Sequence, residues 1–136
     1  MTLEMFKAKL HMLTVTQADL YYEGSITIDS ELLDVAGILP YEKVQVVNIN
    51  NGARLETYTI PGQAGSRQVC MNGPAARITQ VGDRVIVMAY AHMSREEAQK
   101  HKPRVVLMDG SNNPVRITDE SVPGFRYNPD EVAHQH

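Results

Sequence analysis

The stretch from Val44 to Ile60 restricts the possible folds more than any other part of the chain. It reads VQVVNIN-NG-ARLETYTI, two runs rich in β-branched residues that meet at Asn51-Gly52. An Asn-Gly pair suits the positive φ angles of a type I′ turn, and Val, Ile and Thr favour extended backbone. The pattern therefore predicts a β-hairpin with a two-residue turn at Asn51-Gly52.

Other segments of the chain also have the pattern of short strands. Apolar and polar residues alternate from Phe6 to Met12, which gives that strand an apolar and a basic face. Further strands are expected at Ser25–Asp29, in SRQVCM (66–71), in RVVLMD (104–109) and in GDRVIVMAYAHM (82–93), where the apolar run predicts burial on both faces.

Two short helices complete the expected secondary structure. The segment DSELLDVAGILP can be capped by Asp29 or Ser30 and limited by Gly37 and Pro40, and Ser94 with Glu97 has the spacing of a capping box. Many short strands, few helices and frequent Gly and Pro turns favour a mostly β protein in the form of a small barrel.

Length and composition narrow the class of protein. The 136 residues, 43% of them hydrophobic, suit one domain, which we expect over residues 1–110, followed by a polar, loosely ordered tail at 111–136. The net charge of −3 without a basic block argues against nucleic acid as a partner, and no apolar run has membrane-spanning length.

A cytoplasmic protein is expected, because the N-terminus lacks the apolar core of a signal peptide. The single cysteine, Cys70, excludes an intrachain disulfide and is interpreted as a small buried hydrophobe.

Periodicity alone leaves the function open. Lys9 and His11 share one face of the first strand, and Arg54 and Tyr58 share a face of another, with Thr57 on the opposite side. On spacing alone, a solvated strand face is the preferred explanation for Lys9 and His11, and a cross-strand surface pair explains Arg54 and Tyr58. Gly24-Ser25 and Asn72-Gly73 are most simply interpreted as turns. We find no phosphate-binding loop, no HExxH zinc motif and no serine-hydrolase elbow, and we expect no metal site.

Four segments together, however, point to one family. KLHMLTVTQADLYYEGS, DVAGILPYEKVQVVNINNGARLETY, GSRQVCMNGPAA and VGDRVIV closely resemble the bacterial aspartate 1-decarboxylases, over about Met5 to Asp109. Members of this family are pyruvoyl-dependent carboxy-lyases that convert L-aspartate to β-alanine and CO2 for pantothenate synthesis. The resemblance implies a double-psi β-barrel, assembled as a homotetramer with active sites between neighbouring subunits.

The resemblance also implies that the chain cuts itself between Gly24 and Ser25. The Ser25 hydroxyl would attack the Gly24 carbonyl, and β-elimination and hydrolysis would then leave a covalent pyruvoyl group. The products would be a β chain of residues 1–24 and an α chain of residues 25–136. A glycine at 24 removes a Cβ that would crowd the attack and permits unusual backbone angles. Thr57 is the residue whose hydroxyl is implied to activate the Gly24 carbonyl.

The remaining site residues follow from the resemblance as well. Lys9 and Arg54 are implied to bind the carboxylates of L-aspartate, and Tyr58 to protonate the carbanion left by CO2. Tyr22 and His11 would position the substrate, and Asn72, Gly73 and Ala75 would supply an amide side chain and backbone N–H groups. Pro74 stands where the family has a small residue, and it brings no N–H.

Two other functions are compatible with the sequence. One is a non-catalytic barrel that serves as a binding module or stays unprocessed, against which stands the joint presence of Ser25, Lys9, Arg54, Thr57 and Tyr58. The other is a pyruvoyl decarboxylase for a different amino acid, with glutamate as the nearest candidate by charge. Spontaneous cleavage and cleavage assisted by a helper protein both fit the sequence.

Overall fold

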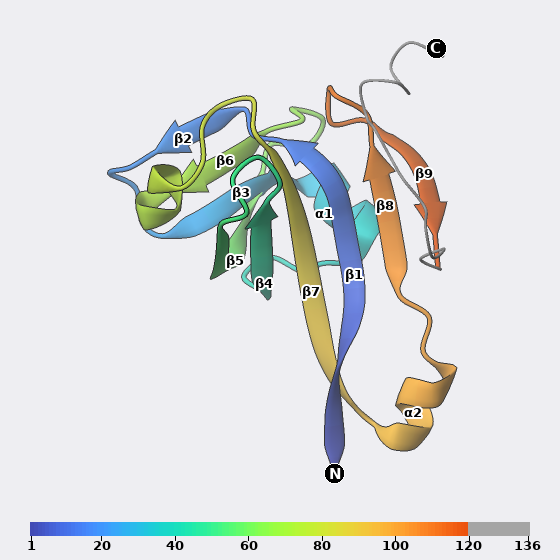
Figure 1. The fold of residues 1–136 in the computed structure, drawn as a ribbon. Coiled ribbons are helices and arrows are strands. Elements are labelled where there is room, and N and C mark those ends of the chain that lie inside the picture. The colour runs from blue at the N-terminus through green and yellow to red at the C-terminus, as the bar shows by residue number, and fades with distance from the viewer. Residues whose placement is uncertain (120–136) are drawn as a thin grey trace.

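β-Strands dominate the protein, as Figure 1 shows for a computed structural model in which residues 1–119 are described. The strands are β1 (Thr2–Thr14), β2 (Gln17–Asp19), β3 (Ser25–Asp29), β4 (Lys43–Asn48), β5 (Arg54–Gly62), β6 (Val69–Asn72), β7 (Arg84–Ser94), β8 (Arg104–Met108) and β9 (Pro114–Thr118). The helices are α1 (Ser30–Ala36), α2 (Arg95–Lys100) and the 3-10 helix η1 (Gly73–Arg77).

All nine of these strands belong to one sheet in the order β2-β6-β3-β5-β4-β7-β1-β8-β9. Three neighbouring pairs are parallel, β1 with β8, β3 with β5 and β2 with β6, and the other pairs are antiparallel. The sheet encloses one cluster of buried side chains, contributed mainly by β1, β3, β4, β6, β7, β8 and α1. The expected mostly β class with a few short helices is therefore confirmed, and the arrangement is consistent with a small β-barrel.

The hairpin of β4 and β5 is confirmed, but the expected two-residue turn is wrong. β4 ends at Asn48 and β5 begins at Arg54, so residues 49–53 form the loop, in which only Gly52 has a positive φ. The buried Asn48 explains the early end of β4, because its amide donates to Ile78 O (2.9 Å) and Asp83 Oδ2 (2.8 Å). These contacts with residues far away in the sequence, rather than the Asn51-Gly52 pair, explain the position at which β4 ends.

β7 also differs from expectation, because only one of its faces is fully buried. Val85, Val87 and Ala89 are in the core, whereas the alternate residues are partly exposed and Tyr90 is exposed. β7 pairs in antiparallel fashion with β1 and β4, and antiparallel strands commonly bury a single face.

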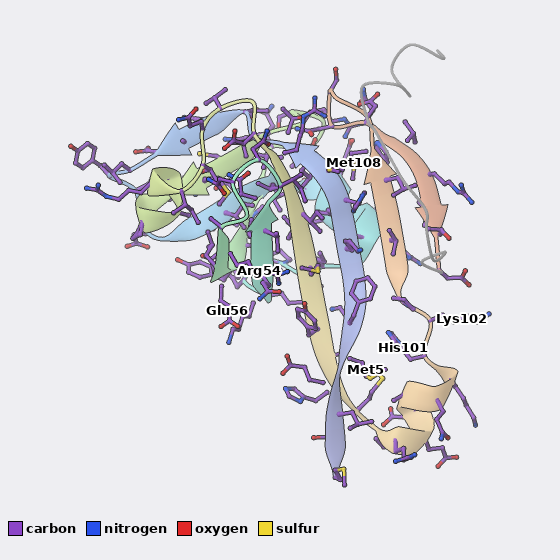
Figure 2. The ribbon with its side chains drawn as sticks, viewed as in Figure 1. Met5, Arg54, Glu56, His101, Lys102 and Met108 are labelled. Carbon is purple, nitrogen blue, oxygen red and sulfur yellow. The ribbon has the colours of Figure 1, made fainter. Side chains whose placement is uncertain are left out.

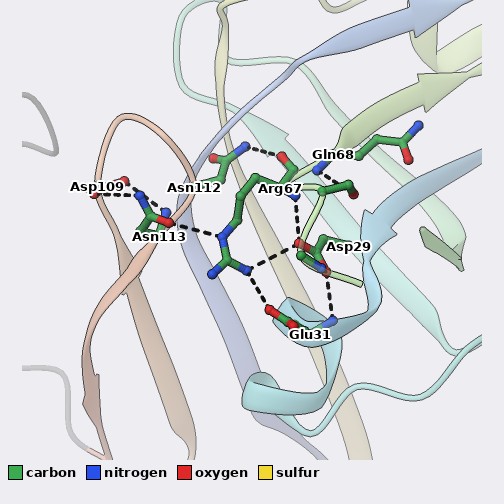
Figure 3. A network of polar contacts seen from close by, with 9 residues as sticks. Asp29, Glu31, Arg67, Gln68, Asp109, Asn112 and Asn113 are labelled. Atoms are coloured by element: carbon green, nitrogen blue, oxygen red, sulfur yellow. Dashed lines mark hydrogen bonds and ion pairs between the residues drawn. The ribbon is translucent and has the colours of Figure 1, made fainter. Parts of the chain in front are cut away.

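The sheet continues past residue 110, where we expected the domain to end. β9 pairs with β8, and the turn between them is anchored by buried Asn112. The Asn112 amide donates to Thr14 O (2.9 Å) and to Arg67 O (3.0 Å), the second of which Figure 3 shows. The polar residues of this turn therefore serve as hydrogen-bonding anchors, which composition alone does not distinguish from a loose tail. Residues 120–136 of the expected tail lie outside the described residues.

Asp29 fixes the end of β3, the strand that begins at Ser25. Its carboxylate is fully buried and accepts hydrogen bonds from the backbone N–H groups of Glu31 (2.9 Å), Gly65 (3.1 Å) and Arg67 (2.7 Å), the first of which caps α1 (Figure 3). The Arg67 guanidinium lies 3.3 Å from the same carboxylate. Burial alone would raise the pKa of Asp29, but these backbone bonds and the Arg67 charge bring it below its ordinary value.

None of the helices within residues 1–119 combines the length and the apolar character needed to cross a lipid bilayer.

Candidate active site

Ser25 is fully buried at the first position of β3. Its hydroxyl donates to the backbone oxygen of Glu23 (3.2 Å) and accepts from the side-chain amide of Asn72 (2.9 Å). Asn72 is the residue of β6 directly opposite Ser25 in the antiparallel pairing of β3 and β6. The serine oxygen is therefore held by two partners and is not a solvated turn residue.

The Asn72 side chain is the centre of a small buried network. Its Nδ2 also donates to Thr27 Oγ1 (2.9 Å), and its Oδ1 accepts from Cys70 Sγ (3.0 Å). Ser25, Thr27, Cys70 and Asn72 share one face of β3 and β6 because side chains alternate along a strand. Ile26 and Met71 point the other way, into the core.

Gly73 allows an unusually close approach of two backbone segments. It has a φ of +67°, and a Cβ at this position would lie 2.8 Å from Tyr22 O and 2.9 Å from the Cα and N atoms of Gly24. Gly24 itself has no positive φ, and a Cβ there would meet only Pro74 Cδ, at 3.7 Å. In the uncut chain Gly24 therefore does not use the left-handed backbone that glycine permits, and the steric need for glycine falls on Gly73.

We predict that Gly73→Ala destabilises the protein far more than Gly24→Ala. The alanine at 73 would combine left-handed backbone with contacts to main-chain atoms that cannot rotate away, at a cost of about 2 kcal/mol or more. The free energy of unfolding from urea titrations provides the comparison. Equal effects of the two substitutions would contradict the close approach at Gly73.

β5 carries Arg54, Thr57 and Tyr58 on a regular strand. Its pairing with β4 runs from Arg54 opposite Val47 to Tyr58 opposite Lys43 without a bulge. Arg54 and Tyr58 therefore share one face with Glu56, and Thr57 points to the other face. Figure 2 shows Arg54 and Glu56 on the outside of the sheet. The exposed Arg54 donates to Gln45 Oε1 (3.4 Å).

The pairing of β5 with β3 relates these residues to the cleavage position. The two strands are parallel, with Ile26 opposite Thr59. Extending this register beyond the paired residues by one position would place Tyr58 opposite Ser25, and extending it by two positions would place Thr57 opposite Gly24. Arg54 lies four residues further back, roughly 13 Å along the strand from Tyr58 at about 3.3 Å per residue.

Lys9 and His11 lie on β1, which is separated from β3 by β5, β4 and β7 in the order of the sheet. The Lys9 ammonium is 5.3 Å from the centre of the Phe6 ring, and partial burial lowers the pKa of Lys9. Burial first, and then the Lys9 charge, lowers the pKa of His11 to about 4. At neutral pH, His11 is therefore neutral.

The structure thus gathers some of the expected site residues and separates others. It brings together Tyr22, Gly24, Ser25, Asn72 and Gly73, with the buried Ala75 following in η1. Within one chain, it places Lys9 and His11 on β1, which is separated from β3 by three strands in the order of the sheet. In residues 1–119, no three His, Cys, Asp or Glu side chains are grouped so that they could hold a metal ion.

Sequence reasoning missed Cys70 and Thr27 as partners of Asn72. A signal for them was available, because positions 70 and 72 and positions 25 and 27 alternate on two strand-like segments. The sequence pattern does not reveal that these two strands, β3 and β6, are paired with Ser25 opposite Asn72 and Thr27 opposite Cys70.

Comparisons with known proteins show the family of the chain. Residues 1–115 match the family model described as aspartate decarboxylase. The aspartate 1-decarboxylase of Salinibacter ruber is 69% identical over 113 residues, covering 83% of this chain and 77% of that protein. The aspartate 1-decarboxylase of Desulfitobacterium hafniense is 60% identical over 120 residues, covering 88% of this chain and 94% of that protein. The aspartate 1-decarboxylase of Carboxydothermus hydrogenoformans is 59% identical over 124 residues, covering 91% of this chain and 98% of that protein. From this coverage and identity, the chain belongs to the aspartate decarboxylase family.

Proposed function

We propose that this protein decarboxylates L-aspartate to β-alanine and CO2, the reaction that supplies β-alanine for pantothenate, in the cytoplasm. It would use a pyruvoyl group made from Ser25 after cleavage of the Gly24–Ser25 bond. The observation that carries this proposal is the buried Ser25 hydroxyl, held by Asn72 at the start of β3 in a chain of this family.

Maturation begins when Ser25 Oγ bonds to the carbonyl carbon of Gly24. The Gly24 C–N bond breaks, the hydroxyl proton ends on the freed amine, and the amide becomes an ester. Loss of the Ser25 α-proton then breaks the Cβ–Oγ bond, and Oγ departs as part of the Gly24 carboxylate. Hydrolysis of the resulting dehydroalanine by one water releases ammonia and leaves the keto group.

The contacts of Ser25 suit this sequence of steps. Asn72 Nδ2 already donates to Oγ at 2.9 Å, and Oγ is the atom on which negative charge develops as it leaves. The backbone before Ser25 is packed against Gly73, which limits the conformations of the bond to be cut. Thr57, beside Gly24 in the continued register of β3 and β5, is assigned the activation of the Gly24 carbonyl.

The surroundings of Ser25 also fit the product of maturation. The new group is no larger than the serine it replaces, and Asn72 and Thr27 would remain beside it. The pyruvoyl ketone supplies an electron sink of the kind that pyridoxal phosphate supplies in other enzymes.

The substrate carries two carboxylates, and two cations are assigned to bind them. Arg54 offers a planar fork for bidentate binding and Lys9 a point charge, while the neutral His11 and Tyr22 position the substrate. The hydroxyl of Tyr58, on the strand next to Ser25, delivers a proton to the carbon that has lost CO2.

The positions of these residues in one chain support a site that draws on more than one copy. Lys9 and Ser25 are separated by three strands of the sheet, and the regular β5 directs Thr57 away from the face of Arg54 and Tyr58. A site shared between neighbouring subunits of a homotetramer, as the resemblance implies, reconciles these positions with one reaction.

Mixing two inactive variants tests the shared site. Chains carrying Lys9→Ala lack a substrate-binding cation, and chains carrying Ser25→Ala lack the precursor of the pyruvoyl group. Co-expressed in equal amounts, they should recover about a quarter of the wild-type activity, because each site draws the two residues from different copies at random. Recovery of no activity would mean that Lys9 and Ser25 serve the same site from one chain.

Mass spectrometry of the intact wild-type protein tests the proposal as a whole. We expect fragments of residues 1–24 and 25–136, the larger one without a free amine and reactive toward hydrazine, together with release of β-alanine from L-aspartate. A single uncut chain without activity would favour the binding module, and faster turnover of glutamate would assign a different substrate. Incubating purified uncut chain with and without cell extract distinguishes spontaneous cleavage from cleavage that needs a helper protein.

A further inference from the structure

Cys70 lies on β6 between β2 and β3, opposite Gln17 on one side and Thr27 on the other. It is buried, with 4% of its surface exposed, which agrees with its interpretation as a small hydrophobe. However, its thiol is hydrogen-bonded rather than merely packed, because Sγ lies 3.0 Å from Asn72 Oδ1. The proposed mechanism has so far assigned no role to this contact.

The orientation of the Asn72 carboxamide decides which atom faces Ser25. A half-turn of the amide would exchange its oxygen and its NH2 group, which differ little in shape but are opposite in hydrogen-bonding character. Only the NH2 group can donate to Ser25 Oγ while the serine proton is directed to Glu23 O, as observed. The flipped amide would present an acceptor to the oxygen on which negative charge must develop.

The Cys70 thiol favours the observed orientation. A thiol can donate its proton to the amide oxygen, whereas its sulfur is a weak acceptor for the NH2 group. Burial, and then the negative charge of Asp19, raise the pKa of the Cys70 thiol, so it keeps its proton at neutral pH. On the other side of the amide, Thr27 Oγ1 accepts the second N–H at 2.9 Å.

We propose that Cys70 is a positioning residue for self-cleavage, which orients the Asn72 carboxamide so that its NH2 group faces Ser25 Oγ. This inference rests on the proposed maturation at Gly24-Ser25. Cys70 acts only through Asn72 and touches neither the bond that is cut nor the substrate.

The rate of self-cleavage in Cys70 variants tests the inference. Chains are made by cell-free translation, and the appearance of fragment 25–136 is followed by intact mass from the moment synthesis stops. Cys70→Ala removes the donor and should slow cleavage about three- to tenfold, the range expected for one neutral hydrogen bond. Cys70→Ser keeps a donor of similar size and should cleave within about twofold of the wild-type rate.

Val69→Ala is the matched control for a purely structural effect. Val69 precedes Cys70 on β6 but points into the core, away from Asn72, and is fully buried. This variant should lower the melting temperature at least as much as Cys70→Ala and still cleave at the wild-type rate.

The proposal is overturned if Cys70→Ala cleaves as fast as wild type, if Cys70→Ser is as slow as Cys70→Ala, or if Val69→Ala slows cleavage equally. A wild-type chain that remains whole in the same reaction, also after cell extract is added, would instead refute the proposed maturation, and with it this inference. The two failures are therefore distinguished by the wild-type sample.

Discussion

Replacing Ser25 with alanine should leave the chain in one piece and without any decarboxylase activity. Alanine has no Oγ to attack the Gly24 carbonyl and no leaving group for the elimination, so neither the ester nor the keto group can form. Intact mass should show one species of full length, and hydrazine should find no carbonyl to react with. Formation of β-alanine from L-aspartate should fall to the background of the assay.

Thr27→Val is the control for this variant. Thr27 lies two residues along the same face of β3, and its hydroxyl is bound by the same Asn72 amide. Valine keeps the shape of the side chain, so this chain should fold and be cut between Gly24 and Ser25, at a reduced rate. Any 25–136 fragment from the Ser25→Ala chain would show that another group performs the cleavage.

Much of the fold follows from local sequence patterns. The two helix caps were predicted and are confirmed: Asp29 accepts from Glu31 N at the start of α1, and Ser94 and Glu97 form the capping box of α2. The strands β3 and β8 were also predicted with nearly the observed bounds. These features depend on residues within a few positions of one another, which is why a sequence pattern specifies them.

The features that were missed depend on residues far apart in the chain. The β4–β5 loop opens at Asn48 because of contacts with Ile78 and Asp83, and the β8–β9 turn is held by the contacts of Asn112 with Thr14 and Arg67. No local pattern contains these partners. A two-residue hairpin turn and a loosely ordered segment directly after residue 110 were therefore reasonable predictions from composition, but the loop at 49–53 and the strand β9 differ from them.

In the candidate site, too, the features set by local sequence were predicted and those set by residues far apart in the chain were not. Alternation correctly predicted that Arg54 and Tyr58 share a face that Thr57 does not, since β5 is regular. The steric role of Gly73 could not be predicted, because it arises where η1 meets the chain before Ser25. The separation of β1, which carries Lys9, from β3, which begins at Ser25, could not be predicted either, because it depends on the order of the strands in the sheet.

Tyr58→Phe should separate maturation from catalysis. The phenol hydroxyl takes no part in the attack of Ser25 Oγ on Gly24, so this chain should be cut completely and carry a full complement of hydrazine-reactive carbonyl. Decarboxylation should nevertheless slow by about a hundredfold or more, the contribution typical of a positioned general acid. The measurement is kcat for β-alanine formation, divided by the carbonyl content of the same sample.

Tyr90→Phe shows whether loss of a phenol elsewhere on the outer surface has the same effect. The Tyr90 hydroxyl donates to Gln45 Oε1 (3.2 Å), the same oxygen that accepts from Arg54. Because Tyr90 is on β7 and Tyr58 is on the strand beside Ser25, Tyr90→Phe should retain most of the wild-type kcat. If fully matured Tyr58→Phe turned over L-aspartate as fast as wild type, the proton delivered after CO2 leaves would have to come from another group, and the assignment of Tyr58 would be wrong.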